Sequence, residues 1–197
     1  MFLIVKNMEE KEMKILICLG NPGRQYEFTR HNAAWIFIDA LVERMNIEWE
    51  KDSYSNSFLA RYKNLIIVKP QTFMNLSGEV LPFLMKKYHI ENRENTIAMY
   101  DDINYEVGEY GVTFNKGTSH HNGARSIDTV LKSKAYLRLR IGIGKNGLVP
   151  VTDYVLGIFS KEEIVLIKNC AKNEEHLLDN LLQYLPLDFL NKNNNQN

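Results

Sequence analysis

The spacing of apolar and polar residues changes repeatedly between the two-residue period of strands and the longer period of helices. Residues 14–19 are a continuous apolar run, which predicts a buried strand, and residues 31–45 carry a strong apolar face at helical spacing. By the same criteria we expect further strands at 58–62, 65–68, 96–100, 110–114 and 137–143, and further helices at 77–88, 123–134 and 161–182. The alternation predicts an α/β fold, a single domain with a twisted, mixed and largely parallel sheet flanked by helices on both faces.

Turn and capping residues separate these elements. Gly20-Asn21-Pro22-Gly23 follows the first strand, and Gly117 to Gly123 precedes the helix that ends near residue 134. Thr29 and Ser77 stand just before or at predicted helix starts, so we expect both to act as N-caps. The strand at 110–114 is predicted to lie at an edge of the sheet.

Length and composition are those of one globular domain, with 197 residues, 45% hydrophobic and 24% charged. We expect this domain at 14–190, after a short extension at 1–13 to which we assign no function and before a disordered tail at 191–197. Neither a membrane span nor a targeting segment is predicted, and Cys18 and Cys170 are expected to be buried thiols. These features predict a cytoplasmic protein.

Charge is balanced overall but unevenly distributed. Residues 116–145 hold seven Lys or Arg and one acid, so this segment carries +6 and the remainder of the chain −6. A solvated helix face is the ordinary explanation of such a segment, and a phosphate-binding surface is the alternative. The choice depends on an independent sign of nucleic-acid binding.

Polar side chains gather where predicted strands end. Open α/β sheets bind ligands beyond the carboxyl ends of their strands, so residues that follow different strands can meet there. Those expected at this edge are Asn21, Asn75 and Asp101 after strands, His31 at a helix start, and the turn His121-Asn122-Gly123. Each residue alone would be an ordinary cap or turn former, and only the combination indicates a site.

The sequence lacks the motifs of several common catalytic mechanisms. There is no Gly-x-Ser-x-Gly elbow, and the five histidines show no metal-ligand spacing. The Gly-x-Gly-x-x-Gly match at 142–147 is followed by Leu148-Val149-Pro150-Val151 rather than by a helix, so it does not indicate a dinucleotide site. We therefore expect neither a metal nor an organic cofactor.

Attack by water is the chemistry that remains. A histidine can serve as base, a carboxylate can orient its imidazole, and asparagine amides can hold a carbonyl and its developing oxyanion. We therefore predict His31 as the general base and Asp101 as its partner. The positive end of the predicted helix should lower the pKa of His31, Asp101 should raise it, and the balance is expected near neutrality.

At these residues the chain resembles the bacterial-type peptidyl-tRNA hydrolases. The resemblance runs from about Lys14 to Phe159 and rests on these ordered motifs: Gly20-Asn21-Pro22-Gly23 with Tyr26 and Thr29-Arg30-His31-Asn32; Lys69-Pro70-Gln71-Thr72-Phe73-Met74-Asn75-Leu76-Ser77-Gly78; Tyr100-Asp101-Asp102; His121-Asn122-Gly123; Arg138-Leu139-Arg140-Ile141-Gly142-Ile143-Gly144; and Tyr154-Val155-Leu156-Gly157 with Phe159. It implies a monomeric α/β enzyme without a cofactor. Such an enzyme hydrolyses the ester between a peptidyl group and the tRNA 3′ end and so recycles tRNA.

The resemblance also implies roles for individual residues. His31 is the expected proton acceptor, Asp101 stabilises it, and Asn21 distinguishes N-blocked from free aminoacyl groups. The residues expected to contact the tRNA end and the peptide are Tyr26, Phe73, Met74, Asn75, His121 and Asn122. The basic segment becomes the expected platform for acceptor-stem phosphates, with Lys132 and Arg138 among its contacts.

Three departures from the family pattern concern RNA binding more than chemistry. The stretch 111–115 is neutral where relatives are often basic, His120 replaces an expected glycine, and Asn104 stands where Asp is usual. Two alternatives therefore remain open. A non-catalytic RNA-binding relative would keep the fold and the basic surface, and a paralogue would act on another acyl ester.

Overall fold

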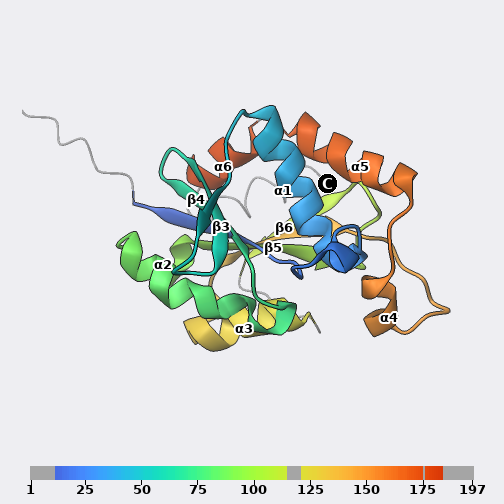
Figure 1. The fold of residues 1–197 in the computed structure, drawn as a ribbon, viewed down its shortest axis with the longest axis horizontal. Helices are drawn as coiled ribbons and strands as arrows, with labels where there is room; N and C mark the ends of the chain where they lie inside the picture. The colour runs from blue at the N-terminus through green and yellow to red at the C-terminus, as the bar shows by residue number, and fades with distance from the viewer. Residues whose placement is uncertain (1–11, 115–120, 175, 184–197) are drawn as a thin grey trace, which may run out of the picture.

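Seven strands form one sheet at the centre of the structure, a computed structural model that describes residues 12–114, 121–174 and 176–183 (Figure 1). The strands are β1 (Lys14–Cys18), β2 (Glu50–Asp52), β3 (Ser57–Tyr62), β4 (Leu65–Pro70), β5 (Thr96–Asp102), β6 (Tyr110–Phe114) and β7 (Leu137–Gly142). Their order is β2-β3-β4-β1-β5-β7-β6, in which β4, β1, β5 and β7 run parallel and the outer pairs are antiparallel. The predicted mixed, largely parallel sheet is confirmed, with β6 at one edge.

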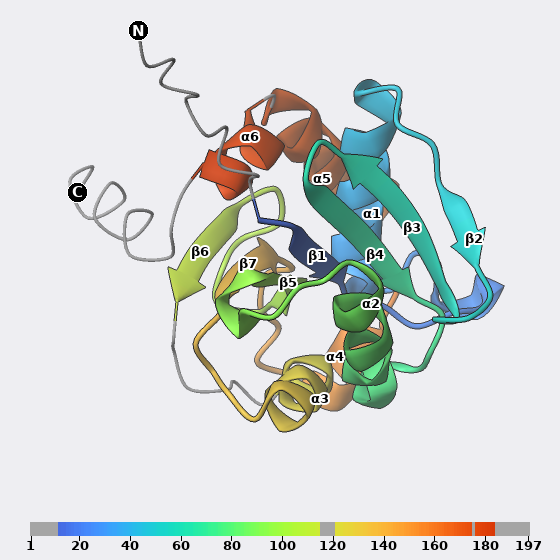
Figure 2. The ribbon, with the colours of Figure 1, turned by 90° about the vertical axis from the view of Figure 1, so that its left-hand side faces the viewer.

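Helices cover both faces of the sheet. They are α1 (Ala33–Arg44), α2 (Leu81–Lys87), α3 (Asn122–Leu131), α4 (Val151–Leu156), α5 (Lys161–Asn173) and α6 (Leu177–Gln183), with the 3-10 segments η1 (Arg24–Tyr26), η2 (Arg30–Asn32), η3 (Met74–Val80) and η4 (Arg93–Asn95). Figures 1 and 2 show α1, α5 and α6 on one face and α2 and α3 on the other. In β1, Leu16 and Cys18 pack on the face covered by α1, α5 and α6, and Ile15 and Ile17 pack on the face covered by α2 and α3. Successive side chains of a strand alternate between faces in this way. All four are buried, as the apolar run predicted.

The helix predicted from residue 31 begins later than expected. Residues 30–32 form the 3-10 segment η2, and α1 starts at Ala33. Thr29 does not act as a side-chain cap, because its Oγ1 donates to the carbonyl of Tyr26, 2.9 Å away. His31 therefore lies in a tight turn before α1.

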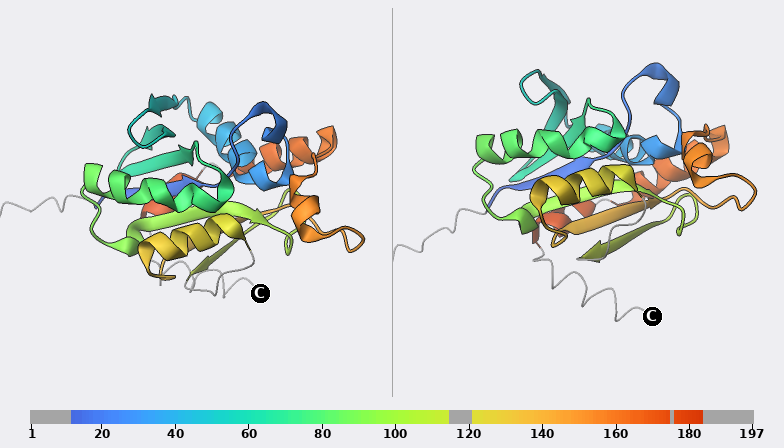
Figure 3. Two further views of the ribbon diagram at one scale, coloured as in Figure 1. Left: turned by 60° about the horizontal axis from the view of Figure 1, so that its bottom comes forward. Right: turned by 90° about the horizontal axis from the view of Figure 1, so that it is seen from below.

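The helix predicted at 77–88 also differs at its start. The segment η3 comes first, and the regular helix α2 follows with Pro82 in its first turn, where a missing N–H leaves no helical bond unmade. Ser77 is not a helix cap, because its Oγ donates to the Met74 carbonyl at 2.9 Å. Figure 3 shows that η3 and α2 run beside α3 on the same face of the sheet.

The single helix predicted at 161–182 is two helices. α5 begins with a capping box, in which the side chains of Ser160 and Glu163 accept from each other's backbone N–H groups. α5 ends at Asn173 and α6 begins at Leu177, and no glycine or proline lies between them to mark the break. The break allows the leucines of α6 to pack on the same face of the sheet as α1.

Two short elements were not predicted. β2 has three residues, and α4 has six residues of which none is buried. Neither element is long enough, or buried enough, to impose a hydrophobic period on its sequence. Sequence patterns therefore could not distinguish them from loops.

The remaining sequence predictions concern the chain ends, the cysteines and membrane spans. Residues 1–11, 115–120 and 184–197 lie outside the described residues, so the extension at 1–13, the tail at 191–197 and most of the turn at 117–123 stay predictions. Cys18 is buried as predicted and Cys170 is only half-buried, and both are free thiols. Among the described helices, none combines the length and the apolar character that crossing a membrane would require.

Candidate active site

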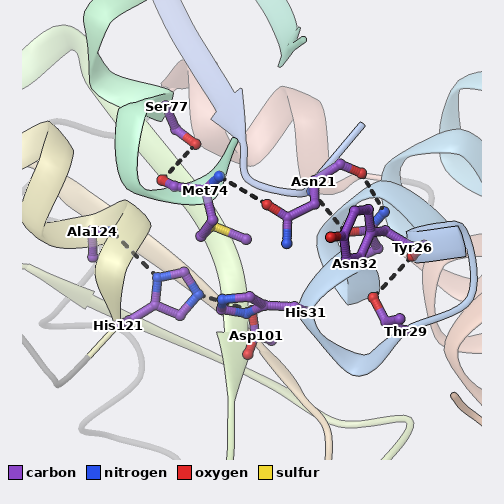
Figure 4. Close-up of polar contacts among 10 residues, drawn as sticks. All are labelled: Asn21, Tyr26, Thr29, His31, Asn32, Met74, Ser77, Asp101, His121 and Ala124. Carbon is purple, nitrogen blue, oxygen red and sulfur yellow. Dashed lines mark hydrogen bonds and ion pairs between the residues drawn. The ribbon is translucent and has the colours of Figure 1, made fainter. Parts of the chain in front are cut away.

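The carboxyl ends of β1 and β5 lie side by side and carry a cluster of polar side chains (Figure 4). Asn21 follows β1, and Asp101 lies near the end of β5. His31 enters from η2, and His121 from the residue before α3. The structure brings these four residues together at the sheet edge to which the strand-end argument had assigned them.

Asp101 lies at the centre of this cluster. The residue is 4% exposed, and its Oδ1 lies 2.8 Å from both His31 Nδ1 and His121 Nε2. Burial alone would raise the pKa of Asp101, but the charges and hydrogen bonds of the two histidines outweigh it and hold this pKa well below its usual range. Asp101 is therefore a buried carboxylate that stays ionised at neutral pH.

The tautomer of His121 follows from its two partners. His121 precedes α3 and caps it, because its Nδ1 accepts from the Ala124 N–H at 3.3 Å. A ring nitrogen that accepts a hydrogen bond carries no proton, so the proton of the neutral ring is on Nε2 and is donated to Asp101. The sequence assigned His121 to RNA and peptide contacts, whereas the structure shows it bonded to Asp101 and packed against the Tyr100 ring at an interplanar angle of 45°, with ring centroids 4.7 Å apart.

His31 is oriented by the same carboxylate oxygen. With Nδ1–H donated to Asp101, the acceptor nitrogen of neutral His31 is Nε2. Burial lowers the pKa of His31, but the charge of Asp101 and its hydrogen bond together raise it above its ordinary value. The helix-end contribution predicted from the sequence is not the opposing effect, because α1 begins two residues later at Ala33.

Asn21 is held by its backbone and by its side-chain oxygen. The Asn32 side chain accepts from the Asn21 N–H at 2.8 Å and donates to the Asn21 carbonyl at 3.0 Å. Asn21 Oδ1 in turn accepts from the Met74 N–H at 2.8 Å, so the amide NH₂ points away from Met74 (Figure 4). No residue in the described part of the chain accepts from this Nδ2, which makes it a fixed donor available to a ligand.

Tyr26 and Phe73 form an aromatic rim. Their rings meet edge to face with centroids 6.4 Å apart, and Phe73 is 54% exposed, so its ring can stack on a nucleobase. Met74 was grouped with them in the sequence, but it is 4% exposed and packs at Gly123, where an added Cβ would meet its Sδ at 2.6 Å. A stacking role for the Met74 side chain is therefore excluded by its burial.

The basic segment, residues 116–145, offers fewer cations for phosphate binding than its net charge suggested. Arg138 is 1% exposed, its Nη2 lies 3.2 Å from Asp128 Oδ1, and its guanidinium covers the Tyr136 ring. The prediction that Arg138 contacts phosphate is wrong, because its guanidinium is buried and paired with Asp128. Arg140 is likewise bonded to Asp102 of β5, whereas Lys132, at the end of α3, is exposed.

Arg30 is a structural residue that sequence reasoning did not single out. It donates to both carboxylate oxygens of Glu163, at 3.1 and 3.2 Å, and its guanidinium lies over the rings of Tyr154 and Phe159. It thereby ties the turn that carries His31 to the start of α5. Its place in the motif Thr29-Arg30-His31-Asn32 was the available signal, as it was for Asn32.

One group of ligand-type side chains in the described residues could hold a metal ion, and it consists of His31, Asp101 and His121. Both ring nitrogens are at hydrogen-bond distance from one carboxylate oxygen. The capping bond of His121 also fixes which of its nitrogens faces Asp101. Hydrogen bonds therefore account for the arrangement of these three side chains.

Fold and site together define a single-domain α/β hydrolase with a histidine–aspartate pair at the carboxyl edge of its sheet. The arrangement suits attack by an activated water on a polarised carbonyl. The chain belongs to the peptidyl-tRNA hydrolase family, whose sequence profile matches residues 15–197. This match continues beyond Phe159, where the resemblance of the sequence motifs ended.

Individual relatives agree with this assignment. The peptidyl-tRNA hydrolase of Bacillus cytotoxicus is 38% identical over 188 residues, which cover 93% of this chain and 100% of the relative. That of Mycoplasmopsis agalactiae is 33% identical over 186 residues, 94% of this chain and 97% of the relative. Two crystal structures of Acinetobacter baumannii peptidyl-tRNA hydrolase, one of them a mutant, match with TM-scores of 0.78 and 0.75 at 27% and 26% identity, covering 94% and 92% of both chains.

Proposed function

We propose that this chain hydrolyses the ester between a peptidyl, or N-blocked aminoacyl, group and the 3′ end of tRNA, with His31 as the general base. The substrate class comes from the family and from the relatives named peptidyl-tRNA hydrolase. One observation carries the choice of base: the 2.8 Å bond from His31 Nδ1 to Asp101 Oδ1 leaves Nε2 to accept a proton.

In the proposed reaction, His31 Nε2 takes a proton from a water molecule as the water oxygen attacks the ester carbonyl carbon. The fixed Nδ2 donor of Asn21 stabilises the negative charge that develops on the carbonyl oxygen. Asp101 stabilises the imidazolium. The bond to the ribose oxygen then breaks, and the imidazolium returns its proton to that oxygen, which releases free tRNA and the peptide.

Other residues would bind the substrate rather than react with it. The exposed ring of Phe73, supported by Tyr26, offers a surface on which the terminal adenine can stack. Asn75 and Asn122 are exposed, and each follows a residue of the site in sequence, Met74 and His121 respectively. On this proposal they contact the tRNA end.

The proposal includes the wider setting predicted from the sequence: a cytoplasmic monomer that uses neither a metal nor an organic cofactor. Its base and oxyanion donors are all side chains of the chain itself, so dialysis against a chelator should leave the rate unchanged. Size-exclusion chromatography with light scattering measures the oligomeric state. A chelator-sensitive rate or a stable dimer would contradict these parts of the proposal.

The experiment that tests the reaction compares N-acetylated with free aminoacyl-tRNA as substrate. We expect cleavage of the blocked form alone, and a loss of about 10²–10⁴-fold in kcat for His31→Ala. His176→Ala, at an exposed position before α6, is the matched control. No cleavage of either substrate would support a non-catalytic RNA-binding relative, indifference to the block would support a paralogue, and a loss below tenfold would reject His31 as the base.

A further inference from the structure

Trp35, in the first turn of α1, packs against the turn that carries Asn21. A Cβ added at Gly20, the residue before Asn21, would meet the indole Cδ2 and Cε2 atoms at 2.6 Å and Nε1 at 2.8 Å. The indole therefore lies directly against the Gly20 backbone, with no room for a side chain between them. Neither the reaction nor the substrate contacts proposed above use this residue.

The same indole fixes the point at which the chain leaves β1. Trp35 Nε1 donates to the carbonyl of Cys18, the last residue of β1, at 2.8 Å. The register that pairs Ile17 with Val68 would assign this carbonyl to the N–H two residues after Val68, at Pro70, and proline has no N–H. Because Cys18 is buried, the indole supplies a bond that neither the sheet nor water can provide.

A lysine of β4 holds the indole in turn. Lys69 Nζ lies 5.8 Å from the centroid of the Trp35 ring and 4.2 Å from that of Trp49. It also pairs with Asp39, which lies one turn after Trp35 in α1. The Lys69 side chain is 12% exposed, so its charge attracts the two rings in surroundings that hold little water. These contacts restrict the position of the indole.

Trp35 and Asn32 hold the same turn from neighbouring positions. They are three residues apart in the segment that leads into α1, so both side chains leave one side of it. Asn32 bonds to both backbone groups of Asn21, and Trp35 fixes the two residues before Asn21 that lead out of β1. His31 precedes them both. One short segment therefore supplies the proposed base and the two side chains that hold the turn of the proposed oxyanion donor.

We propose that Trp35 is a positioning residue, which sets the place of the Asn21 amide relative to His31 by holding the turn between β1 and Asn21. The inference rests on the proposed function, in which Asn21 Nδ2 stabilises the charge on the carbonyl oxygen. A donor displaced by about 1 Å can lose about 10²-fold in rate. An indole held against the preceding residue prevents such a displacement without touching the substrate.

Kinetics of two phenylalanine variants test the inference with the full-length protein. Trp35→Phe removes the N–H that holds the Cys18 carbonyl. We expect kcat for N-acetylated aminoacyl-tRNA to fall by about tenfold and KM to change by less than about twofold, because the oxyanion forms only in the transition state. Trp49→Phe is the matched control, since it makes the same change at the other ring beside Lys69, and its kcat should be that of the wild type.

The Asn21→Ala background separates positioning from a general loss of structure. If Trp35 acts through the Asn21 amide, Trp35→Phe should change kcat by less than about twofold once that amide is absent, so the two effects should not add. Gly20→Ala is a second perturbation of the same contact, because its Cβ would meet the indole at 2.6 Å, and it should show the same pattern. The pH midpoint assigned to His31 should stay unmoved in both variants, because neither changes a group that contacts the imidazole.

Hydrogen exchange provides a measurement that does not depend on activity. The Asn21 N–H, which is bonded to Asn32, should exchange about tenfold faster in Trp35→Phe, beyond any change at Leu16 in the middle of β1. Leu16 reports the stability of the sheet, so the difference between the two residues reports loosening of the turn. In Trp49→Phe the Asn21 N–H should exchange at the wild-type rate.

An unchanged kcat in Trp35→Phe, an equal loss with and without the Asn21 amide, or an unchanged exchange rate at Asn21 would overturn the inference. So would a shifted pH midpoint, because Trp35 would then act on the base. The proposed function fails by a different result. A wild-type protein that cleaves no N-acetylated aminoacyl-tRNA loses the hydrolase assignment, while faster exchange at Asn21 in Trp35→Phe keeps the positioning assignment.

Discussion

Asn32 is a residue whose replacement should disable the site without removing any group that reacts. It is 1% exposed, and its side chain makes two bonds to the backbone of Asn21, at 2.8 and 3.0 Å. Asn32→Ala removes the partner of a buried N–H and of a buried carbonyl. At about 1–3 kcal/mol for each group left unsatisfied, the free energy of unfolding should fall by about 2–6 kcal/mol.

A second variant, Asn32→Asp, distinguishes the two bonds by their dependence on pH. The ionised carboxylate still accepts from the Asn21 N–H, but it repels the Asn21 carbonyl oxygen; the protonated carboxyl can donate to that oxygen and restore both bonds. Folding therefore raises the pKa of the introduced carboxyl above its unfolded value of about 3.9. A raised pKa stabilises the folded state below the unfolded pKa, and that stability is lost as pH rises through the folded pKa.

Urea unfolding at about pH 4 and about pH 7.5 measures both effects. Asn32→Asp should be close to the wild type at the lower pH and clearly destabilised at the higher one, while Asn32→Ala should be destabilised at both. At the higher pH, kcat/KM should fall by about 10²-fold in each variant, because Asn21 loses its placement. Asn169→Ala, exposed on α5, is the control. An alanine variant as stable as the wild type, or an aspartate variant equally impaired at both pH values, would refute the reasoning.

Three further results are expected. kcat/KM should rise with pH to a plateau with a midpoint above 6.5, because Asp101 raises the pKa of His31 above that ordinary value and only the neutral base is active; Asp101→Asn should move the midpoint to lower pH, and an unmoved midpoint would contradict the assignment. Gly78→Ala should cost about 1–3 kcal/mol of stability, since its Cβ would meet the Ser126 carbonyl oxygen at 2.5 Å, and an unchanged Tm would show that η3 can move away. Arg138→Met should lower stability by about 3 kcal/mol, because it removes the cation that pairs with Asp128 of α3 and leaves that carboxylate only the Tyr136 hydroxyl, while the salt dependence of tRNA affinity stays that of the wild type; a smaller salt slope would mean that Arg138 reaches the RNA.

Strands were easier to predict than helix boundaries. β1, β5 and β7 are almost entirely buried, and their apolar residues, continuous in β1 and β5 and alternating with arginines in β7, mark them to within about two residues. The start of α1 and of α2 was misplaced because 3-10 segments precede both helices. A 3-10 turn has nearly the same hydrophobic pattern as an α-helical turn, and packing against neighbouring elements selects between them.

The location of the site could be predicted from the sequence, but the hydrogen-bond partners of its residues could be predicted only in part. Asn21, His31 and Asp101 could be grouped because Asn21 and Asp101 lie at the carboxyl ends of strands that a parallel sheet brings side by side. His121 was assigned to RNA contacts because nothing in its local sequence shows a bond to a carboxylate 20 residues earlier. Asn32 appeared in a motif, but no sequence feature indicated that it clamps the backbone of Asn21.

The sequence alone was sufficient to predict the α/β architecture and the sheet edge at which the polar side chains gather. Hydrophobic periodicity indicates which residues are buried, and parallel strands end at a common edge. It also indicated the family. Only the folded structure showed which nitrogen of His31 is bonded to Asp101 and which arginines are exposed to solvent. These properties depend on distances of a few ångströms to groups on other elements, such as Asp101 beside His31 and Asp128 beside Arg138, and no local pattern encodes such distances.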